Sequence, residues 1–278
     1  NKFHGMFAKN YRAYCSVIKF RVTMAEQRII AIVNQKGGVG KTTTTINMAA
    51  ALTLRNQKVL LIDLDPQGNA ATGLGISKST CKTTIYDVFI DNTPISSAVI
   101  ATIVPGLDIV PSHIDLSGAE LQIGSRQGRT TILRNAIKGM EYDYILIDCP
   151  PSLNLLTVNA LAAAKSVLVP LQCEFFALEG LSQLLQTVEM AKANINSSLV
   201  IDGVMLTMHD KRNKLSDQVA IDVKKHLGRA VFKTIIPRNV RVAEAPSFGK
   251  PVIMYDPKCA GSKAYMRLGD EILERHTE

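Results

Sequence analysis

Residues 34–43 combine glycines, lysines and threonines in an order that suits the binding of phosphate groups. The segment reads Asn-Gln-Lys-Gly-Gly-Val-Gly-Lys-Thr-Thr and lies between an apolar run and an alanine-rich stretch. A triphosphate needs a concave row of backbone N–H groups at the start of a helix, and glycines let the backbone turn tightly and approach the oxygens. Gly37, Gly38 and Gly40 would supply this row, so the segment predicts a phosphate-binding loop (P-loop).

Each remaining residue of this loop has an expected role. Lys41 should reach the β- and γ-phosphates, and the Thr42 hydroxyl should bind Mg²⁺. Val39 and Thr43 complete the predicted ATP-binding backbone. A glycine-rich turn with incidental lysines is the alternative, but the position between a strand and a helix favours the P-loop. The sequence therefore predicts ATP and Mg²⁺ as ligands.

Two carboxylates with i, i+2 spacing follow the next apolar run, in Leu-Ile-Asp-Leu-Asp-Pro-Gln-Gly-Asn. They fall at the expected carboxyl end of a strand, and in an open α/β sheet that edge faces the ligand. We expect Asp65 to orient or deprotonate the attacking water, because hydrolysis needs an acceptor near the γ-phosphate. Two roles stay open for Asp63, which could contribute to the magnesium shell or cap the turn.

A third carboxylate follows the apolar run Tyr-Ile-Leu-Ile at residues 144–147. Asp148 is expected to hold Mg²⁺ through water, as the acidic residue that follows such a strand does in other P-loop proteins. The alternative is a buried acid that caps the following helix. Cys149 is expected to be an inert packed thiol, since the sequence offers no basic partner to activate it.

Short β-branched runs alternate with helical stretches from Arg28 onward, which is typical of parallel strands joined by crossover helices. Because most of these runs are apolar almost throughout, helices should cover both faces of the sheet. We therefore predict an α/β fold of the P-loop NTPase type with a mostly parallel central sheet. The expected strands are 29–33, 59–63, 107–110, 144–148, 166–170, 201–206 and 231–236. The expected helices are 41–55, 130–138, 153–163, 178–193, 215–227 and 262–275.

Residues 24–278 are expected to form a single domain, since no repeat, low-complexity tract or Pro/Gly linker divides them. Residues 68–128 are the least regular part and should form loops and short helices around the nucleotide site. A second domain there is disfavoured, because few apolar residues are available for another core. Residues 1–23 are basic and acid-free and precede Met24, so an upstream start is favoured over a transit peptide and the segment is expected to lie outside the fold.

Composition limits the classes of function. The net charge is +8, but residues 1–23 contain five basic and no acidic residues, which leaves +3 for the rest. Any binding of nucleic acid must therefore come from a local patch. The five cysteines never form a C-x-x-C pair, which argues against a disulfide framework or a metal knuckle. The longest apolar stretch, 153–171, is interrupted by two asparagines and a lysine, so no transmembrane span is expected.

The P-loop departs from the ordinary pattern at two positions. Gln35 stands where a glycine would come five residues before Gly40, and an additional lysine, Lys36, precedes the glycines. This K-G-G-x-G-K-T arrangement resembles the deviant Walker A motif of the ParA, MinD, nitrogenase iron protein and arsenite-pump ATPases. In that group the additional lysine reaches across a nucleotide sandwich dimer, and the resemblance implies that Lys36 contacts the ATP phosphates of a partner subunit.

Other segments narrow the resemblance to the ParA/Soj family of chromosome-partitioning ATPases, over residues 29–271. They read D-L-D-P-Q-G-N, D-C-P-P-S, P-L-Q, F-A-L-E-G and I-P-R-N-V-R. The last of these segments lies by the adenine in the family, so the resemblance implies base contacts for Pro237 and Arg238. It also implies ATP-dependent homodimers, a ParB-type partner that stimulates hydrolysis, and binding of non-specific DNA. Arg212 and Arg241 match family positions associated with DNA contact.

Basic residues are concentrated late in the chain, where phosphate contacts would give non-specific, salt-sensitive affinity for DNA. The cluster contains Lys211, Arg212, Lys214, Lys224, Lys225, Arg229, Lys233, Arg238 and Arg241. The alternative is that these side chains are solvated faces of helices.

We therefore expect a cytoplasmic, nucleoid-associated ATPase in which ATP and Mg²⁺ close a dimer on DNA and hydrolysis reopens it. The main alternative is a MinD-like or other positioning or assembly ATPase that acts on a membrane or a protein array. Membrane attachment is disfavoured, because residues 271–278 are acidic and poor in apolar side chains, unlike a basic amphipathic anchor. A small-molecule kinase is a weaker alternative, since no acceptor-binding segment is apparent.

Overall fold

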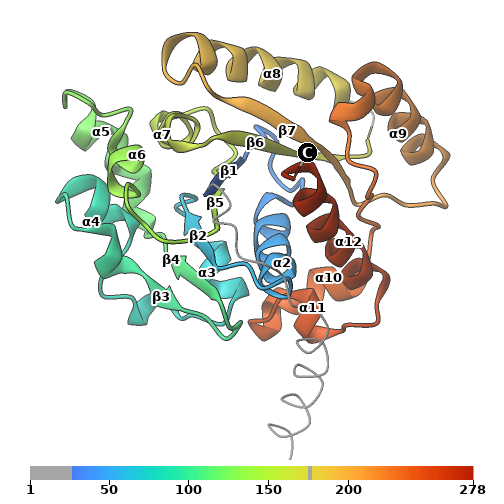
Figure 1. Cartoon of the computed structure of the whole chain (residues 1–278), viewed down its shortest axis with the longest axis horizontal. Helices are drawn as coiled ribbons and strands as arrows, with labels where there is room; N and C mark the ends of the chain where they lie inside the picture. Colours follow the sequence, from blue (N-terminus) through green and yellow to red (C-terminus); the bar gives the residue numbers. More distant parts are fainter. Residues whose placement is uncertain (1–26, 175–176, 278) are drawn as a thin grey trace, which may run out of the picture.

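A seven-stranded sheet with the order β3-β4-β2-β5-β1-β6-β7 forms the centre of the molecule (Figure 1). The computed structural model describes residues 27–174 and 177–277; the predicted extension, residues 1–23, lies outside them. All strand pairs in the sheet are parallel except β3 with β4. The strands are β1 (Arg28–Ile32), β2 (Val59–Asp63), β3 (Ile100–Ala101), β4 (Leu107–Val110), β5 (Tyr144–Asp148), β6 (Ser166–Gln172) and β7 (Val200–Thr207). The prediction of a mostly parallel α/β sheet is confirmed.

Helices cover both faces of the sheet (Figure 1). One face packs against α4 (Ile85–Ile90), α5 (Ala119–Ile123), α6 (Ile132–Ala136), α7 (Leu155–Ala163), α8 (Ala177–Asn194) and α9 (Lys214–Leu227). The other packs against α2 (Lys41–Thr53), α3 (Asn69–Gly73), α10 (Val240–Glu244), α11 (Val252–Tyr255) and α12 (Ala260–Arg275). The short 3₁₀ turns are η1 (Lys78–Thr80), η2 (Ile95–Ala98), η3 (Ile114–Gly118), η4 (Gly228–Ala230) and η5 (Ala245–Phe248).

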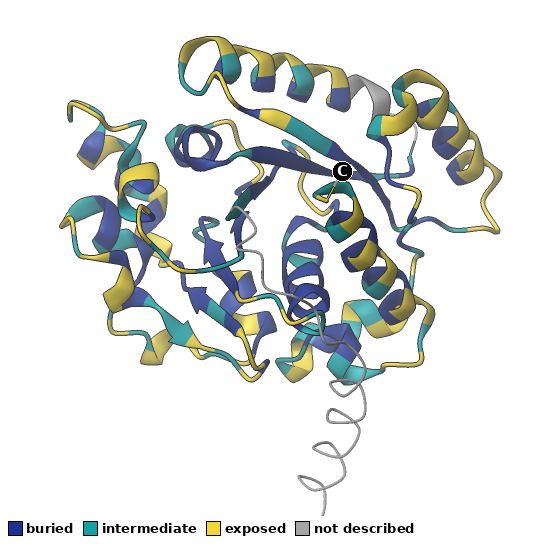
Figure 2. Cartoon of the chain, viewed as in Figure 1, coloured by how far each residue is buried: buried dark blue, intermediate teal, exposed yellow. Residues whose placement is uncertain are grey.

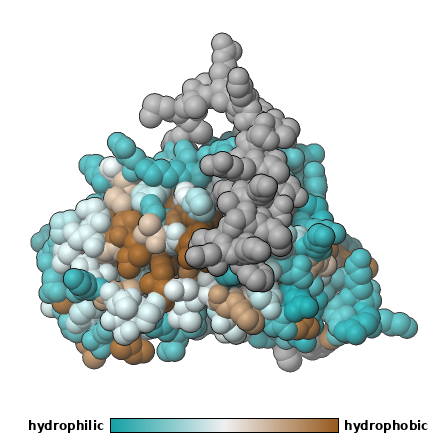
Figure 3. Space-filling model, turned by 90° about the horizontal axis from the view of Figure 1, so that it is seen from below, coloured by the Kyte–Doolittle hydropathy of each residue, from teal (hydrophilic) through white to brown (hydrophobic). Residues whose placement is uncertain are grey.

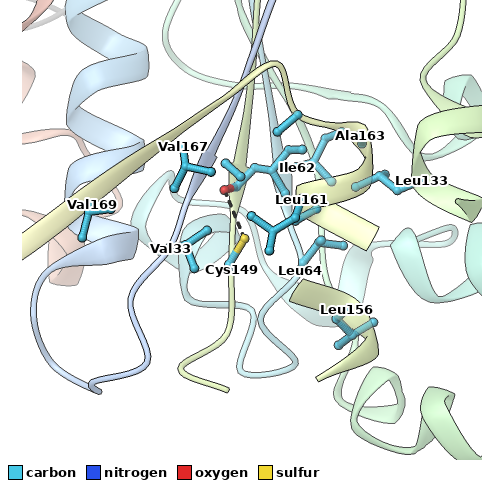
Figure 4. Close-up of a cluster of buried hydrophobic side chains, with 14 of the residues drawn as sticks. Val33, Ile62, Leu64, Leu133, Cys149, Leu156, Leu161, Ala163, Val167 and Val169 are labelled. Carbon is cyan, nitrogen blue, oxygen red and sulfur yellow. Dashed lines mark hydrogen bonds between the residues drawn. The ribbon is translucent and has the colours of Figure 1, made fainter. Parts of the chain in front are cut away.

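The strands divide their side chains between two separate core layers. In β1, Ile30 and Ile32 pack with α2 and α12, whereas Ala31 and the following Val33 pack with α7 and α8. Successive residues of a strand point to opposite faces, so an apolar run can satisfy both layers only if every position is apolar. Figure 2 shows the result, with buried strands inside and exposed residues on the outer faces of the helices. Figure 4 shows part of the second layer, where Cys149 lies among Val33, Leu64 and Leu161.

One predicted strand, 231–236, is wrong. An isolated bridge joins Val231 to Val204 of β7, and a second one joins Pro237 to His209, just after each segment. Between them, the N–H groups of Phe232 and Ile236 donate to carbonyls of β7, but no continuous ladder forms. The physical reason lies in α12, where the Glu271 carboxylate accepts the backbone N–H groups of Lys233 and Thr234 at 2.6 and 2.9 Å. These donors are therefore engaged by a side chain and cannot form a ladder of hydrogen bonds with a strand.

The other predicted strands are confirmed, with ends that differ by at most two residues. The predicted helices are confirmed as well, although 130–138 shortens to α6 and several helices shift by one or two residues. Residues 68–128 contain short helices, as predicted, together with the antiparallel strand β3, which the sequence did not indicate because it pairs only two residues. This region also contributes Ile85, Phe89 and Ile123 to the core shared with the sheet.

Side-chain caps fix the starts of three helices near the sheet's carboxyl end. Asn154 accepts the N–H of Thr157 at the start of α7, and Asn213 accepts that of Leu215 at the start of α9. Asn239 plays the same part at α10. Such caps satisfy backbone donors that have no partner inside the helix.

None of the helices in the described residues is both long and apolar enough to cross a bilayer. On the face shown in Figure 3, an apolar area interrupts a surface that is otherwise mostly hydrophilic.

Candidate functional site

The P-loop joins the carboxyl end of β1 to the first residue of α2. Gly38 and Gly40 have φ values of +75° and +89°, a region that residues with a Cβ rarely adopt. A Cβ placed on Gly37 or Gly38 would meet nothing within 4 Å, so the backbone lies open on the side of these two glycines. The loop is anchored by Asn34, whose side chain donates to the Pro170 carbonyl at 2.7 Å and accepts the Lys36 N–H at 3.0 Å. An open, anchored row of backbone amides at a helix start is an anion-binding geometry.

Lys41 is the buried cation of this loop. It is 7% exposed, and its Nζ donates to the carbonyl oxygen of Lys36 at 3.0 Å, which curls the side chain back over the loop. Desolvation lowers the pKa of Lys41, and the negative charge of Asp148 opposes that effect. A buried ammonium next to open backbone amides is arranged to attract the oxygens of a phosphate chain.

Asp148 ends β5 and is fully buried. Its Oδ1 accepts the Thr45 hydroxyl at 3.1 Å, whereas Oδ2 is buried without a partner. Desolvation raises the pKa of Asp148 to about 7, although the hydroxyls of Thr42 and Thr45 act to lower it. Buried polar atoms in native proteins are almost always paired, so an orphaned carboxylate oxygen beside a threonine hydroxyl fits an ion or its water.

The donor set also fits the preferences of magnesium. Among residues 27–174 and 177–277, no group of three or more His, Cys, Asp or Glu side chains is arranged so that it could hold a metal ion by itself. Mg²⁺ is usually bound through one or two carboxylates together with substrate phosphates and water, so Thr42 and Asp148 could hold it without a larger protein cage.

Asp63 lies at the end of β2, in register with Asp148 on β5. Its two oxygens accept the backbone N–H groups of Asp65 and Ala70, both at 3.1 Å, and this geometry matches the turn-capping alternative. Burial, followed by the charge of Asp148, raises the pKa of Asp63 well above its ordinary value. Asp65 is partly exposed, and its Oδ1 accepts the N–H of Gln67 at 3.0 Å, which leaves the second oxygen without a hydrogen bond among the described residues.

Lys36 extends away from the buried part of the loop. Its Nζ forms an ion pair with Glu174, just beyond β6, and the side chains are 51% and 36% exposed. The sequence did not single out Glu174, although its position at the carboxyl end of a strand was a usable signal. Lys36 is thus placed on the surface, where a second molecule can reach it.

Thr207 is a second residue that sequence reasoning missed. It ends β7, is buried, and donates its hydroxyl to the Val39 carbonyl at 2.9 Å. Two residues later His209 accepts the Arg238 N–H through its carbonyl at 2.9 Å, next to the Pro237 bridge. The predicted base contacts, Pro237 and Arg238, are therefore joined to the P-loop through the end of β7.

A cavity of about 330 Å³ borders the start of α2 on the side of α3. Its lining residues are Thr42, Thr43, Ile46, Asn69, Thr72, Gly73, Pro246 and Ser247. Because two predicted ATP-binding residues contribute to it, this space adjoins the phosphate site.

The predicted DNA contacts lie on two separate segments outside this centre. Arg212 is exposed and forms a two-point ion pair with Asp210, with contacts of 3.1 Å. Arg241 pairs with Glu244 at 2.9 Å and with Asp256 at 3.6 Å. Both guanidinium groups thus have carboxylate partners in the free chain, which an anionic ligand would have to replace.

Comparison with known proteins places this site in a family. A family model described as an AAA domain matches residues 27–201. The chromosome partitioning protein ParA of Caulobacter vibrioides is 55% identical, over 90% of this chain and 96% of its own length. The sporulation initiation inhibitor protein Soj of Bacillus subtilis is 51% identical, over 88% of this chain and 98% of its own length.

The chain belongs to the ParA/Soj family. The expected resemblance is thereby confirmed, and another ParA/Soj relative, from Treponema pallidum, carries the name chromosome-partitioning ATPase at 48% identity over 89% of this chain and 98% of its own length.

Solved structures agree with the fold of this ParA/Soj chain. Cobyrinic acid a,c-diamide synthase of Mycobacterium smegmatis, solved with ADP and magnesium, gives a TM-score of 0.80 at 35% identity, covering 91% of this chain and 96% of that one. The cell division ATPase MinD of Pyrococcus furiosus gives a TM-score of 0.75 at 27% identity, covering 90% of this chain and 99% of that one. The P-loop NTPase architecture is therefore established for this member of the family.

Proposed function

We propose that this ParA/Soj chain hydrolyses ATP with Mg²⁺ and acts as a nucleotide-switched dimer on non-specific DNA. It would segregate chromosomal or plasmid DNA together with a ParB-type partner, as a cytoplasmic protein associated with the nucleoid. The names of its relatives, which include chromosome partitioning proteins and an ATPase, support this assignment.

The observation that carries the proposal is the pairing of an open P-loop with two buried, oppositely charged groups. Lys41 and Asp148 are both largely removed from solvent, and Asp148 retains an unpartnered oxygen. Isolated buried charges are costly unless a ligand compensates them, so this arrangement favours a bound phosphate chain with its cation. When bound between Thr42 and Asp148, Mg²⁺ would supply positive charge to the phosphate oxygens.

The chain's own groups would then act on the phosphate end. The amides of residues 37–43 and the Lys41 ammonium bind and orient the oxygens, and they stabilise the charge that develops during transfer. Asp65, whose second oxygen has no hydrogen bond among the described residues, would orient the attacking water and accept its proton as ADP leaves. Asp63 would hold the turn that positions Asp65.

Dimerisation would involve Lys36. Its exposed ammonium can exchange the Glu174 carboxylate for the phosphates of the facing subunit, because an exposed ion pair contributes little stability and is readily replaced. Dimer closure would align the basic surfaces of two subunits. Arg212 and Arg241 would then exchange their carboxylate partners for DNA phosphates.

A second candidate is a MinD-like positioning ATPase, favoured by the structural likeness to MinD. Its site chemistry would be the same, but the dimer would bind a membrane or a protein array. The two candidates therefore differ in what the ATP-bound dimer recognises.

A gel shift with arbitrary duplex DNA separates the two candidates. The full chain should retard the DNA with Mg-ATP, and much less with ADP or without nucleotide, in a salt-dependent manner. The double variant Arg212→Ala with Arg241→Ala should lose most of this binding while it retains ATP. ATP binding without any DNA shift at low salt would reject the DNA-binding function and favour the MinD-like alternative.

A further inference from the structure

The turn from Asp65 to Gly68 carries the carboxylate to which the proposed function assigns the attacking water. From the buried side, Asp63 accepts the N–H groups of Asp65 and Ala70, and it thereby holds the turn at both ends. Within the turn, Gly68 donates its N–H to the Asp65 carbonyl at 2.8 Å, and Gln67 donates its N–H to Asp65 Oδ1 at 3.0 Å. The orientation of the Asp65 side chain therefore depends on the position of Gln67.

Lys78, the first residue of η1, holds the same turn from the outside. Its Nζ donates to the Gln67 carbonyl, and its aliphatic stem lies over Gly68. A Cβ added to Gly68 would stand 3.0 Å from Lys78 Cε and 3.4 Å from Cδ and Nζ, and Gly68 is buried although Gln67 beside it is exposed. Gln67 is thus held at its N–H by Asp65 and at its carbonyl by Lys78.

The chain after α3 brings Lys78 back to this turn. Ile76 donates its N–H to the Ala71 carbonyl at 3.0 Å, which reverses the chain at the end of the helix. The Ser77 carbonyl then accepts both the N–H and the hydroxyl of Thr80, at 3.1 and 2.7 Å, and so closes η1 around Lys78. The lysine therefore extends from a segment that has hydrogen bonds of its own.

This contact is suited to a role in the rate of hydrolysis rather than in stability. Gln67 and Lys78 are exposed, and a charged contact at the surface contributes little to the free energy of unfolding. The rate is more sensitive, because a catalytic group that is misplaced by about 1 Å can cost about 100-fold. Loss of Lys78 would give Gln67, and with it Asp65 Oδ1, a wider range of positions.

We propose that Lys78 is a positioning residue for ATP hydrolysis, which keeps Asp65 turned so that its second oxygen faces the attacking water. The inference rests on the proposed function, since Lys78 acts through Asp65 and makes no contact with the nucleotide itself. Removal of the Lys78 ammonium should therefore lower kcat and leave the affinity for Mg-ATP unchanged.

Phosphate release by the full chain, measured over a range of Mg-ATP concentrations, tests this role. Lys78→Ala should lower kcat by about 5- to 20-fold, as expected for a partial loss of orientation, while KM changes by less than about 2-fold. The melting temperature should stay unchanged, because the side chain is exposed. Lys82→Ala, at another exposed lysine beyond η1, is the matched control and should equal the original chain in all three measurements.

Two further variants separate the hydrogen bond from the packing of the lysine stem. Lys78→Met keeps an aliphatic stem over Gly68 but has no N–H donor, so it should be as slow as Lys78→Ala. Lys78→Arg keeps a charged donor that can reach the Gln67 carbonyl, so it should restore most of the original kcat.

A double-variant cycle shows whether Lys78 acts through Asp65. Asp65→Ala removes the carboxylate that Lys78 is proposed to position, so the addition of Lys78→Ala should cause no further loss of rate. Single-turnover hydrolysis of labelled ATP measures the slow variants. If Lys78 instead acted on the phosphates directly, the two losses would multiply.

The inference would be overturned by a normal kcat in Lys78→Ala or Lys78→Met, by a rise in KM that matches the loss of kcat, by a slow Lys78→Arg, or by a further loss in the Asp65→Ala background. Normal hydrolysis by Asp65→Ala itself is a separate result, since it would refute the role of Asp65 in the proposed function and the inference with it.

Discussion

The two edges of the central sheet carry polar side chains in very different states. At the carboxyl edge, Asp148 has an unpartnered oxygen and Met208 is strained. At the amino edge, the Nε2 atom of His276 lies 3.2 Å from both oxygens of Asp202, and its Nδ1 lies 3.1 Å from the Tyr144 hydroxyl. The first edge retains an unsatisfied oxygen, whereas these three side chains of the second edge are paired with one another.

This difference separates ligand binding from stability. Groups that are already paired within the chain, such as Arg275 with the carbonyls of Asp202 and Val231, stabilise the fold and have little capacity left for a ligand. Groups without partners add little to the fold and are available to a ligand. Substitutions at the carboxyl edge should therefore affect activity, and those at the amino edge should affect stability.

The largest expected effect is on activity at the carboxyl edge. Lys41→Ala should lower the ATPase rate by at least about 100-fold, because it removes the buried charge that stabilises the phosphate oxygens. The melting temperature should not fall, since the variant also removes a desolvated ammonium. Phosphate release measures the rate, and Lys138→Ala on the exposed surface is the control. If Lys41→Ala lost much stability but hydrolysed ATP normally, the carboxyl edge would serve stability rather than activity, contrary to the comparison.

An intermediate effect, on stability, is expected near the amino edge. Glu271 accepts the N–H groups of Lys233 and Thr234 and pairs with Arg275, so Glu271→Gln should lower the free energy of unfolding by about 1–3 kcal/mol at pH 7. Urea denaturation measures this difference, and the ATPase rate should change much less than in Lys41→Ala.

The same carboxylate has a predictable dependence on pH. Burial acts to raise the pKa of Glu271, but the hydrogen bonds from Lys233 and Thr234 and the charge of Arg275 bring it below its ordinary value. A lowered pKa means that the stabilisation is present above the pKa of the unfolded chain and is lost as pH falls through the folded value. The difference in the free energy of unfolding between the original chain and Glu271→Gln should therefore become smaller below about pH 4. If this difference stayed constant down to pH 3, the ionised Glu271 carboxylate would not be the source of the stabilisation.

The smallest effect concerns the exposed ion pair of Lys36. Glu174→Gln frees the ammonium and should increase ATP-dependent dimerisation by up to about 5-fold, since exposed pairs contribute about 0.2–1 kcal/mol. The increase should fade at high salt. Light scattering on a sizing column measures the dimer, with Glu189→Gln as the control. A decrease would mean that Glu174 itself supports the dimer.

Local patterns predicted most of the fold and the centre of the site. Gly37–Lys41 and Asp148 could be identified because a P-loop and a buried strand ending in a carboxylate each leave a contiguous signal. Contacts between distant segments left no such signal. Glu271 of α12 accepts the backbone N–H groups of residues 233 and 234, and Thr207 of β7 donates to the Val39 carbonyl in the P-loop. Both contacts join segments that are far apart in the sequence, so local sequence could not predict them.

The strand order has a consequence for synthesis on the ribosome. β1 lies between β5 and β6, which are synthesised much later. The backbone of β1 is therefore paired on both sides only after Tyr144, the partner of Arg28, and Ser166, the partner of Ile30, have left the ribosome. A half-made chain exposes apolar strands with free edges, a state that invites aggregation and calls for chaperones. It also cannot bring Lys41 near Asp148, so a nascent fragment that ends before β5 is unable to consume ATP.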